Sequence, residues 1–328
     1  MKQIRTSIVL FFSAVILFSA CKKSEDNPIT PVAVDESAVL LKYLEENGDY
    51  INTSAPSIVS ASAVYTNLQT GTQYIIDIRS ATDFASGHIQ GAHNVTLGDL
   101  SAHMKTVPSS YTSVVIACYT GQTSMFATTL LRLQGYSNVS SLKWGMCSWD
   151  SVFATGRWLA NMKNDRAANF VTDVTAKNAK GNLPALKTGK TTGKEILDAR
   201  VDQLLKEGFT NTITNATLYT NLSNYYIVNY WPAAQYADPG HIAGAVQYEP
   251  KSSLKSTTDL KTLPTDKAVV IYCYTGQTSA AVATYLKLLG YDAKTLLYGA
   301  NAMIYDRMAA KGMSVFKASE IMRYPYVK

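Results

Sequence analysis

The chain has 328 residues, of which 47% are apolar and only 16% are charged. This length predicts about two domains, and the composition excludes a disordered or highly charged protein. The formal net charge of +6 is too small to indicate a nucleic-acid partner.

The first 20 residues have the pattern of an export signal. Lys2 and Arg5 precede an apolar run over 8–18, which is too short for a stable membrane span. The small residues directly before Cys21 resemble the lipobox of bacterial lipoproteins. That resemblance implies cleavage before Cys21 and lipidation of its thiol. The alternative is a plain secretory signal in which the cysteine occurs by chance.

A polar, proline-bearing stretch over 22–31 follows, as expected of a tether between a lipid and a domain. We therefore predict a signal peptide over 1–20 and a tether over 21–36. The predicted location is the cell envelope, where a lipid anchor would hold the chain on the periplasmic or outer face of a bacterial membrane.

An internal repeat organises the rest of the chain. Four short motifs recur in the same order at nearly constant spacing, which indicates two copies of one domain. The pairs are 65–68 with 219–222, 87–92 with 240–245, 118–124 with 273–279, and 133–136 with 288–291. We predict the first domain over 37–168, a linker over 169–194, and the second domain over 195–328.

Strand and helix patterns alternate within each copy. Runs rich in β-branched residues predict buried strands at 74–78, 114–117, 226–228 and 269–272. Helices are predicted at 124–133 and 279–289, each stopped by a glycine, Gly135 or Gly290. The fold class is therefore α/β, with two tandem domains that each hold a mostly parallel sheet flanked by helices.

Each predicted central strand leads directly into the sequence Cys-Tyr-Thr-Gly-Gln-Thr-Ser, which starts at Cys118 and Cys273. Ligands of such sheets gather at the carboxyl ends of the strands. The mid-loop glycine permits a sharp bend, and the Thr-Ser pairs at 123–124 and 278–279 are expected to cap the following helices. Main-chain N–H groups would then converge into a cup that binds an anion and favours the thiolate form of the cysteine.

These cysteines have two alternative interpretations. A single cysteine at a strand end is more often a small buried apolar residue, whereas two identical loops favour an anion-binding thiol. Phosphate-ester hydrolysis would require an arginine where Ser124 and Ser279 stand, because arginine clamps the phosphate. Sulfur transfer requires no arginine, since the thiolate accepts a sulfane sulfur and the N–H cup stabilises the resulting persulfide.

Both copies are similar to rhodanese domains. The resemblance rests on 77–79 with 84–92 (Asp-Ile-Arg and Phe-Ala-Ser-Gly-His-Ile-Gln-Gly-Ala) and on the six-residue loop over 118–123. It covers roughly 38–165 and 195–328. It implies a sulfurtransferase with catalytic cysteines at Cys118 and Cys273, working without cofactor or metal.

The resemblance also implies a substrate-binding loop after each cysteine. These loops contain Tyr119, Thr120, Gly121, Gln122, Thr123 and Ser124, and Tyr274, Thr275, Gly276, Gln277, Thr278 and Ser279. The donor would be a small sulfur-containing anion and the acceptor a thiol or a cyanide-like molecule. Because the loops carry no basic residue, polysulfide is as plausible a donor as thiosulfate. The alternative is a non-catalytic sulfur-carrier or anion-binding module at the envelope.

Some positions break the repeat. Asn229 and Trp231 replace Asp77 and Arg79 in the second copy, and Cys147 has no counterpart. Cys147 is expected to be either a packed thiol or a resolving thiol that accepts sulfur from Cys118.

Two further patterns carry alternatives. His88 and His241 are expected to make structural hydrogen bonds across their turns, with a general-base role as the alternative. Residues 184–191 resemble a phosphate-binding loop, but a proline replaces its first glycine and no strand precedes it. A nucleotide site is therefore not expected.

Overall fold

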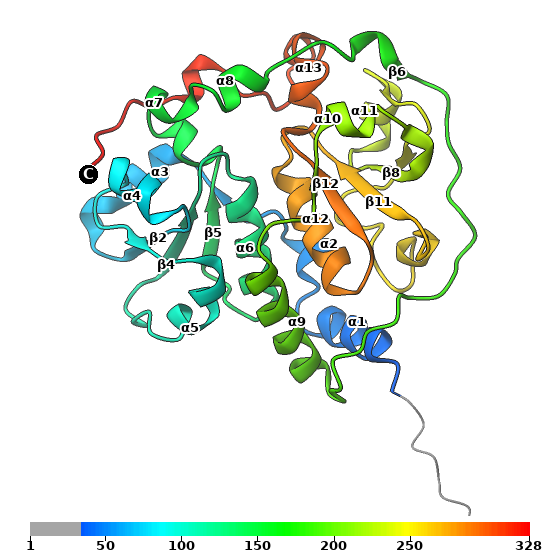
Figure 1. The fold of residues 1–328 in the computed structure, drawn as a ribbon, viewed down its shortest axis with the longest axis horizontal. Helices are drawn as coiled ribbons and strands as arrows, with labels where there is room; N and C mark the ends of the chain where they lie inside the picture. The colour runs from blue at the N-terminus through cyan, green and yellow to red at the C-terminus, as the bar shows by residue number, and fades with distance from the viewer. Residues whose placement is uncertain (1–33) are drawn as a thin grey trace, which may run out of the picture. The chain divides into compact units, whose positions relative to one another are not determined.

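Two five-stranded sheets carry the fold, one in each half of the chain (Figure 1). The strand order is β1-β5-β4-β2-β3 in the first sheet and β7-β12-β11-β8-β10 in the second. Every pairing within these two sheets is parallel. The two halves therefore share one topology, and the predicted fold class is confirmed.

The four predicted strands, which correspond to β2, β4, β8 and β11, lie close to their predicted positions, and six further strands complete the two sheets. In the first sheet the strands are β1 (Ile58–Val59), β2 (Gln73–Asp77), β3 (His93–Asn94), β4 (Ser113–Ala117) and β5 (Val139–Leu142). In the second they are β7 (Thr212–Ile213), β8 (Tyr225–Asn229), β10 (Val246–Gln247), β11 (Ala268–Tyr272) and β12 (Ala293–Leu296). The central strands β4 and β11 are almost wholly buried, as their unbroken apolar sequence requires.

The computed structural model describes residues 34–328, which form one compact unit. The predicted signal peptide, the lipidation site Cys21 and residues 21–33 of the tether lie outside the described residues. Over 34–328, no helix is both long enough and apolar enough to cross a bilayer.

Helices α6 (Gln122–Leu133) and α12 (Gln277–Leu288) follow the two cysteine loops and pack against each other between the two sheets (Figure 1). Gly135 and Gly290 follow these helices with φ of +100° and +99°, as predicted for left-handed stops. The expected capping by the Thr-Ser pairs is wrong. Both helices begin two residues earlier, at the glutamine, and their N-caps are Gly121 and Gly276, which have no capping side chain.

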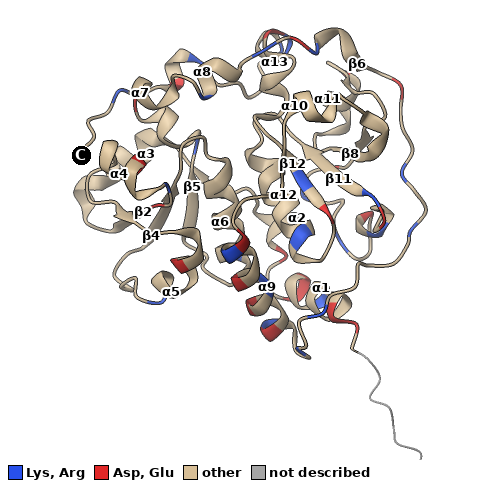
Figure 2. Ribbon diagram, viewed as in Figure 1, with Lys and Arg blue, Asp and Glu red and all other residues tan. Residues whose placement is uncertain are grey.

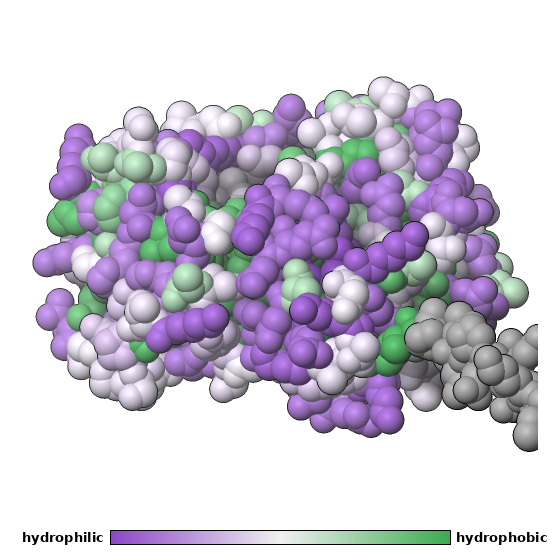
Figure 3. All heavy atoms as spheres, turned by 60° about the horizontal axis from the view of Figure 1, so that its bottom comes forward, coloured by the Kyte–Doolittle hydropathy of each residue, from purple (hydrophilic) through white to green (hydrophobic). Residues whose placement is uncertain are grey.

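Helices α1 (Glu36–Glu46) and α9 (Gly193–Glu207) pack against each other. The buried positions of these helices are mainly leucines, with Ile196 and Val201, while most of their charged residues, marked blue and red in Figure 2, are exposed; Glu36 is buried. The surface that carries these helices is mostly hydrophilic, with scattered apolar spots (Figure 3). Scattered apolar spots are ordinary for a protein surface.

The remaining helices are short. They are α2 (Tyr50–Thr53), α3 (Ala61–Asn67), α4 (Ala81–Ser86), α5 (Leu100–Met104), α7 (Ser151–Ala154), α8 (Trp158–Asn161), α10 (Asn215–Leu218), α11 (Ala233–Ala237) and α13 (Tyr305–Ala310). Asp150 caps α7 by accepting the N–H of Val152 at 2.9 Å. Side-chain caps of this kind satisfy N–H groups that a helix leaves unpaired.

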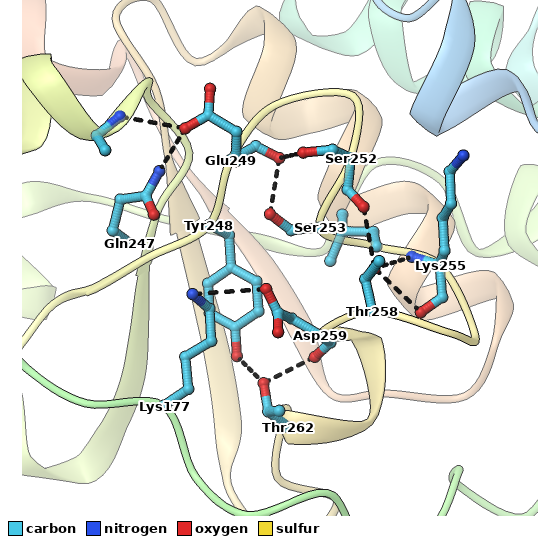
Figure 4. A network of polar contacts seen from close by, with 12 residues as sticks. Lys177, Gln247, Tyr248, Glu249, Ser252, Ser253, Lys255, Thr258, Asp259 and Thr262 are labelled. Carbon is cyan, nitrogen blue, oxygen red and sulfur yellow. Dashed lines mark hydrogen bonds and ion pairs between the residues drawn. The ribbon is translucent and has the colours of Figure 1, made fainter.

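Residues 172–191 run between the halves without helix or strand. The run is fixed at its start, where β6 (Phe170–Val171) pairs antiparallel with β9 (His241–Ile242). Farther on, Lys177 forms an ion pair with Asp259 at 3.5 Å. Asp259 belongs to the polar network that shapes residues 247–262 (Figure 4). The segment is thus ordered along the second half, and the domain boundaries remain a prediction.

The stretch that resembles a phosphate-binding loop holds an internal anion instead. The carboxylate of Glu36 accepts the N–H of Thr188 (2.6 Å), the hydroxyl of Thr188 (2.7 Å) and the N–H of Gly189 (2.9 Å). Burial by itself would raise the pKa of Glu36, but these hydrogen bonds outweigh burial and lower it. The amides that a nucleotide phosphate would use are therefore occupied by the protein's own first helix.

Replacing the carboxylate tests this anchor. We expect Glu36→Gln to lower the free energy of unfolding at pH 7 by about 1–3 kcal/mol, because hydrogen bonds to a charged acceptor are lost. The pKa of Glu36 is lower in the folded state, so its contribution is complete above the unfolded-state value of about 4.3. The difference between the two proteins should shrink as the pH falls below that value.

Urea unfolding at several pH values measures the difference. Glu46→Gln on the exposed face of the same helix is the matched control and should change the free energy of unfolding little, because exposed ion pairs contribute little. A loss in Glu36→Gln that stays constant down to pH 3 would contradict the assignment.

Candidate active site

Cys118 stands at the carboxyl end of β4, and its sulfur is the acceptor for two main-chain N–H groups. Gly121 donates at 3.1 Å and Ser124 at 3.2 Å. The predicted cup of amides is therefore present and turned toward the sulfur. The side chain is only 4% exposed, so the thiol lies at the base of the loop and not on an open surface.

Two glycines make this close geometry attainable. Gly121 has a φ of +84°, a conformation that side chains with a Cβ rarely adopt. Gly145, with a φ of +60°, lies under the loop, where an added Cβ would collide with the carbonyl oxygen of Cys118. The N–H groups of Met146 and Cys147, which follow this glycine, donate to the carbonyls of Cys118 and Tyr119 at 2.8 and 3.0 Å. The loop is thus fixed from below by the turn after β5.

A buried chain of hydroxyl groups extends the cup. The thiol of Cys118 lies 3.3 Å from Oγ of Ser124, which lies 2.7 Å from Oγ of Ser141. Ser141 in turn donates to the carbonyl of Gly121 at 3.3 Å. Since a hydroxyl can donate or accept, Ser124 can accept from a thiol and donate to a thiolate.

The sequence reasoning missed Ser141 and its counterpart Thr295. Both are hydroxyl residues in the short strands β5 and β12, and both are fully buried. Their nearly constant repeat spacing was the available signal. They fell outside the obvious motifs because the residue type changes from serine to threonine.

The second cup, at the end of β11, repeats this arrangement with weaker contacts. Ser279 donates its N–H to the sulfur of Cys273 at 3.3 Å, and its Oγ lies 3.5 Å from that sulfur. Ser279 and Thr295 are linked at 2.8 Å. Among the described residues, this N–H is the one main-chain donor that reaches the sulfur, compared with two at Cys118. Cys273 is 1% exposed.

The rims of the two cups differ in charge. In the first half, the guanidinium groups of Arg157 and Arg79 lie 3.3 and 4.7 Å from the centre of the Tyr119 ring. The hydroxyl of Tyr119 donates to Asp83 at 2.7 Å. Two arginines thus stand beside a loop whose own sequence is neutral, together with the carboxylates of Asp83 and of Asp77, the partner of Arg79. Arg157 lies outside every repeated motif, so the sequence reasoning did not identify it.

In the second half, the rim is aromatic. Trp231, in the place of Arg79, stacks on Tyr274 with ring centres 5.2 Å apart. Burial raises the pKa of Tyr274 to about 12, and nearby Cys273 adds to the effect. The ring therefore stays neutral at ordinary pH. Within residues 34–328, no cation lies over this tyrosine as Arg157 lies over Tyr119.

Asp77 and Arg79 form a buried ion pair at 2.6 Å, and Arg79 also donates to the carbonyl of Gly87 at 2.7 Å. Breaking such a pair would leave a buried charge without a partner. In the second half, Asn229 donates to the hydroxyl of Tyr272 at 2.8 Å instead. These residues support the strand ends in both halves, and the charge of Arg79 is balanced by that of Asp77.

The other predicted loop residues divide into two groups. Tyr119, Thr120 and Thr123, with Tyr274 and Thr278, are half-buried near the rims. Gln122 and Gln277 are buried and point toward the opposite half, and Thr275 is buried as well. The resemblance implies substrate binding for all of them, which stays a prediction; the two glutamines make hydrogen bonds to main-chain groups of the opposite half.

Cys147 is a packed thiol. It is fully buried and donates to the carbonyl of Phe153 at 3.1 Å, and burial raises its pKa to about 12. A thiol in that state is a poor resolving nucleophile, because the thiolate is the reactive form. The interpretation of Cys147 as a packed thiol is therefore favoured over its interpretation as a resolving thiol.

His88 and His241 make structural contacts. Their Nδ1 atoms lie 2.9 Å from the carbonyls of Phe84 and Tyr236 respectively, across the predicted turns. Over 34–328, no cluster of three or more histidine, cysteine or acidic side chains is arranged to hold a metal ion.

Comparison with known proteins places this geometry in a family. The model of the rhodanese-like domain matches residues 60–151 and 185–303. A solved structure of CoADR-RHD from Bacillus anthracis is 26% identical, covers 27% of this chain and 16% of its own, and has a TM-score of 0.25. The chain therefore spans a small part of that protein.

Two longer alignments are weaker in identity. A thiosulfate sulfurtransferase from Pseudomonas aeruginosa is 16% identical over 88% of this chain and 71% of its own, with a TM-score of 0.30. The 3-mercaptopyruvate sulfotransferase SseA from Escherichia coli is 18% identical over 73% of this chain and 97% of its own, with a TM-score of 0.26. The matched domain model covers more than half of the chain, so the chain belongs to the rhodanese family and carries a rhodanese-like domain in each half.

Proposed function

We propose that the chain is a sulfurtransferase that carries sulfane sulfur as a persulfide on Cys118. The observation that carries this proposal is the pair of N–H groups at 3.1 and 3.2 Å from the cysteine sulfur. Such donors stabilise negative charge at the sulfur before and during the reaction. Membership of the rhodanese family supports the same chemistry.

The proposed reaction has two nucleophilic steps. The Cys118 thiolate attacks the sulfane sulfur of the donor, so that a sulfur–sulfur bond forms and the donor's own sulfur–sulfur bond breaks. The donor remainder, sulfite from thiosulfate or a shortened polysulfide, leaves with the electron pair. An acceptor thiolate or cyanide then attacks the outer sulfur, and the Cys118 thiolate is regenerated. No oxidant, cofactor or metal enters the balance.

The structure supports Cys118 over Cys273 as the principal site. Its sulfur receives two main-chain donors instead of one, and its rim carries Arg79 and Arg157 instead of Trp231. Thiosulfate and polysulfides are anions, so Arg157, which has no ion-pair partner among residues 34–328, favours their approach, whereas Arg79 is already paired with Asp77. Because the thiol is 4% exposed, side chains of the rim must move for a donor to reach it.

We also propose that the protein works at the cell envelope, held by a lipid on Cys21. The support is the sequence pattern before Cys21, which lies outside the described residues. The competing proposal is a non-catalytic module that stores sulfur or binds an anion. Burial of Cys118 and Cys273 restricts access to the sulfur in both proposals, so turnover decides between the two.

Cysteine substitution is the direct test. We expect Cys118→Ser to lower kcat/KM for thiosulfate or polysulfide at least about 100-fold, because the nucleophile is lost. Cys273→Ser should lower it less than about 5-fold, because among residues 34–328 one N–H group reaches its sulfur and no cation lies over Tyr274. Steady-state assays with cyanide or dithiothreitol as acceptor measure both.

Mass spectrometry completes this test. After incubation with donor and no acceptor, the peptide that contains Cys118 should gain the mass of one sulfur atom. Cys147→Ala, which changes a packed thiol, is the matched control and should still form this adduct. Full activity in the Cys118→Ser/Cys273→Ser double variant would rule out the mechanism, and an adduct without turnover would support the storage module.

Removing the rim cation tests donor recognition. We expect Arg157→Gln to raise KM for an anionic donor about 3- to 10-fold at low salt, with a smaller effect at high salt because ions screen the charge. Lys311→Gln removes one positive charge in the second half, where Lys311 forms an exposed ion pair with Asp238, and should leave KM within about 2-fold. An equal change in both variants would show that net charge, and not the rim, attracts the donor.

A further inference from the structure

The side chains of Gln122 and Gln277 cross between the two halves. These glutamines are the first residues of α6 and α12, and both are almost fully buried. Nε2 of Gln277 donates to the carbonyl of Gly121 at 3.3 Å, and its Oε1 accepts the N–H of Trp144 at 3.4 Å. Oε1 of Gln122 accepts the N–H of Tyr298 at 2.8 Å. Each cysteine loop is therefore in polar contact with the other half.

We propose that Gln122 and Gln277 are positioning residues, each of which holds the cysteine loop of the opposite half in its amide-inward shape. The importance of this inference for catalysis rests on the proposed sulfur transfer, because the persulfide would form on the cysteine of the loop that the glutamine holds. The geometry itself does not depend on which donor or acceptor is used.

The mid-loop glycines show how close this contact is. A Cβ added to Gly121 would collide with the side chain of Gln277, and one added to Gly276 would collide with the side chain of Gln122. Both glycines have a φ of about +80°. The two glycines therefore serve a second purpose besides the bend, since each leaves the space that the opposite glutamine fills.

The contacts of the two glutamines are connected to the cysteines through the turns after β5 and β12, which lie under the loops. Trp144 and Tyr298 both have a φ of +62°, which is unfavourable for a residue with a side chain and persists only where the surroundings impose it. Their N–H groups are the ones that the glutamines bind. Two residues later, the N–H groups of Met146 and Ala300 donate to the carbonyls of Cys118 and Cys273 at 2.8 and 3.0 Å.

The path from Gln277 to Cys118 thus has two branches. One runs through the Trp144 turn to the cysteine carbonyl, and the other runs directly to the carbonyl of Gly121. The N–H of Gly121 is one of the two donors to the Cys118 sulfur. A change in Gln277 should therefore alter the stabilisation of a thiolate that belongs to the other half of the chain.

The pH dependence of alkylation measures this stabilisation. In the full chain, the rate of iodoacetamide reaction at Cys118 and at Cys273 is followed separately by peptide mass spectrometry. The pH at half-maximal rate reports the thiolate, whereas the plateau rate at high pH reports exposure. Cys147 and Tyr298, which interact with Cys118, and Tyr274, which interacts with Cys273, are the same in all variants.

We expect Gln277→Met, which keeps the volume but loses the polar contacts, to raise the half-maximal pH for Cys118 by about 0.5 to 1 unit. Gln122→Met should do the same for Cys273. Gln134→Met is the matched control. It removes another contact between α6 and the second half, the 3.2 Å hydrogen bond to Asp198, far along the helix from the loop. It should leave both cysteines unchanged.

An unchanged half-maximal pH at Cys118 in a folded Gln277→Met protein would overturn the proposal, as would an equal shift in Gln134→Met. Should Gln277→Met fail to fold, Gln277→Asn keeps the amide one methylene short of its partners and should give a shift in the same direction. Alkylation requires neither donor nor acceptor. A chain without sulfurtransferase activity could still show the crossed effect, so the two proposals fail separately.

Discussion

The first turn of an α-helix leaves N–H groups that find no partner within the helix. At α6 and α12 the N-cap residues are glycines, which have no side chain to accept these N–H groups; at α12 the hydroxyl of Thr275 accepts the first of them, from Gln277, at 3.1 Å. The cysteine sulfur takes over that role by accepting the N–H of Ser124 or Ser279. Fold and chemistry therefore depend on the same interaction. An anionic sulfur is the better acceptor, so the helix start that needs a partner also favours the reactive form of the thiol.

This shared interaction explains how the halves can have identical loops and different surroundings. The cysteine, the glycine and the final serine form the inside of the cup, which has the same geometry in both halves. The tyrosine stands at the rim, where Arg157 and Arg79 contact Tyr119 but Trp231 contacts Tyr274. The tyrosine of the first loop is thus covered by arginine side chains and that of the second by an aromatic ring. Identity of the loop sequence therefore does not establish equal reactivity of Cys118 and Cys273.

Much of the fold could be predicted from the sequence, because the repeat shows the strand, loop and helix patterns once in each half. The central strands and the helices after the loops lie within two residues of their predicted bounds, and the glycine stops at Gly135 and Gly290 have the expected φ. The helix starts were predicted wrongly. The Thr-Ser pair resembles a cap, and local propensity could not show that the sulfur would satisfy the N–H of Ser124 instead.

The missed parts of the site come from distant positions. Arg157 reaches the Tyr119 ring from beyond α7, and Gln277 reaches Gly121 from the other half. Neither contact follows from periodicity or from a motif, because both depend on how separate segments pack. The repeat did hold the relevant clue, since both glutamines were visible within the identical loops. The role of the glutamines becomes clear only from the contact between α6 and α12. Because the two loops are identical, the glutamine of each half fills the space beside the mid-loop glycine of the other half.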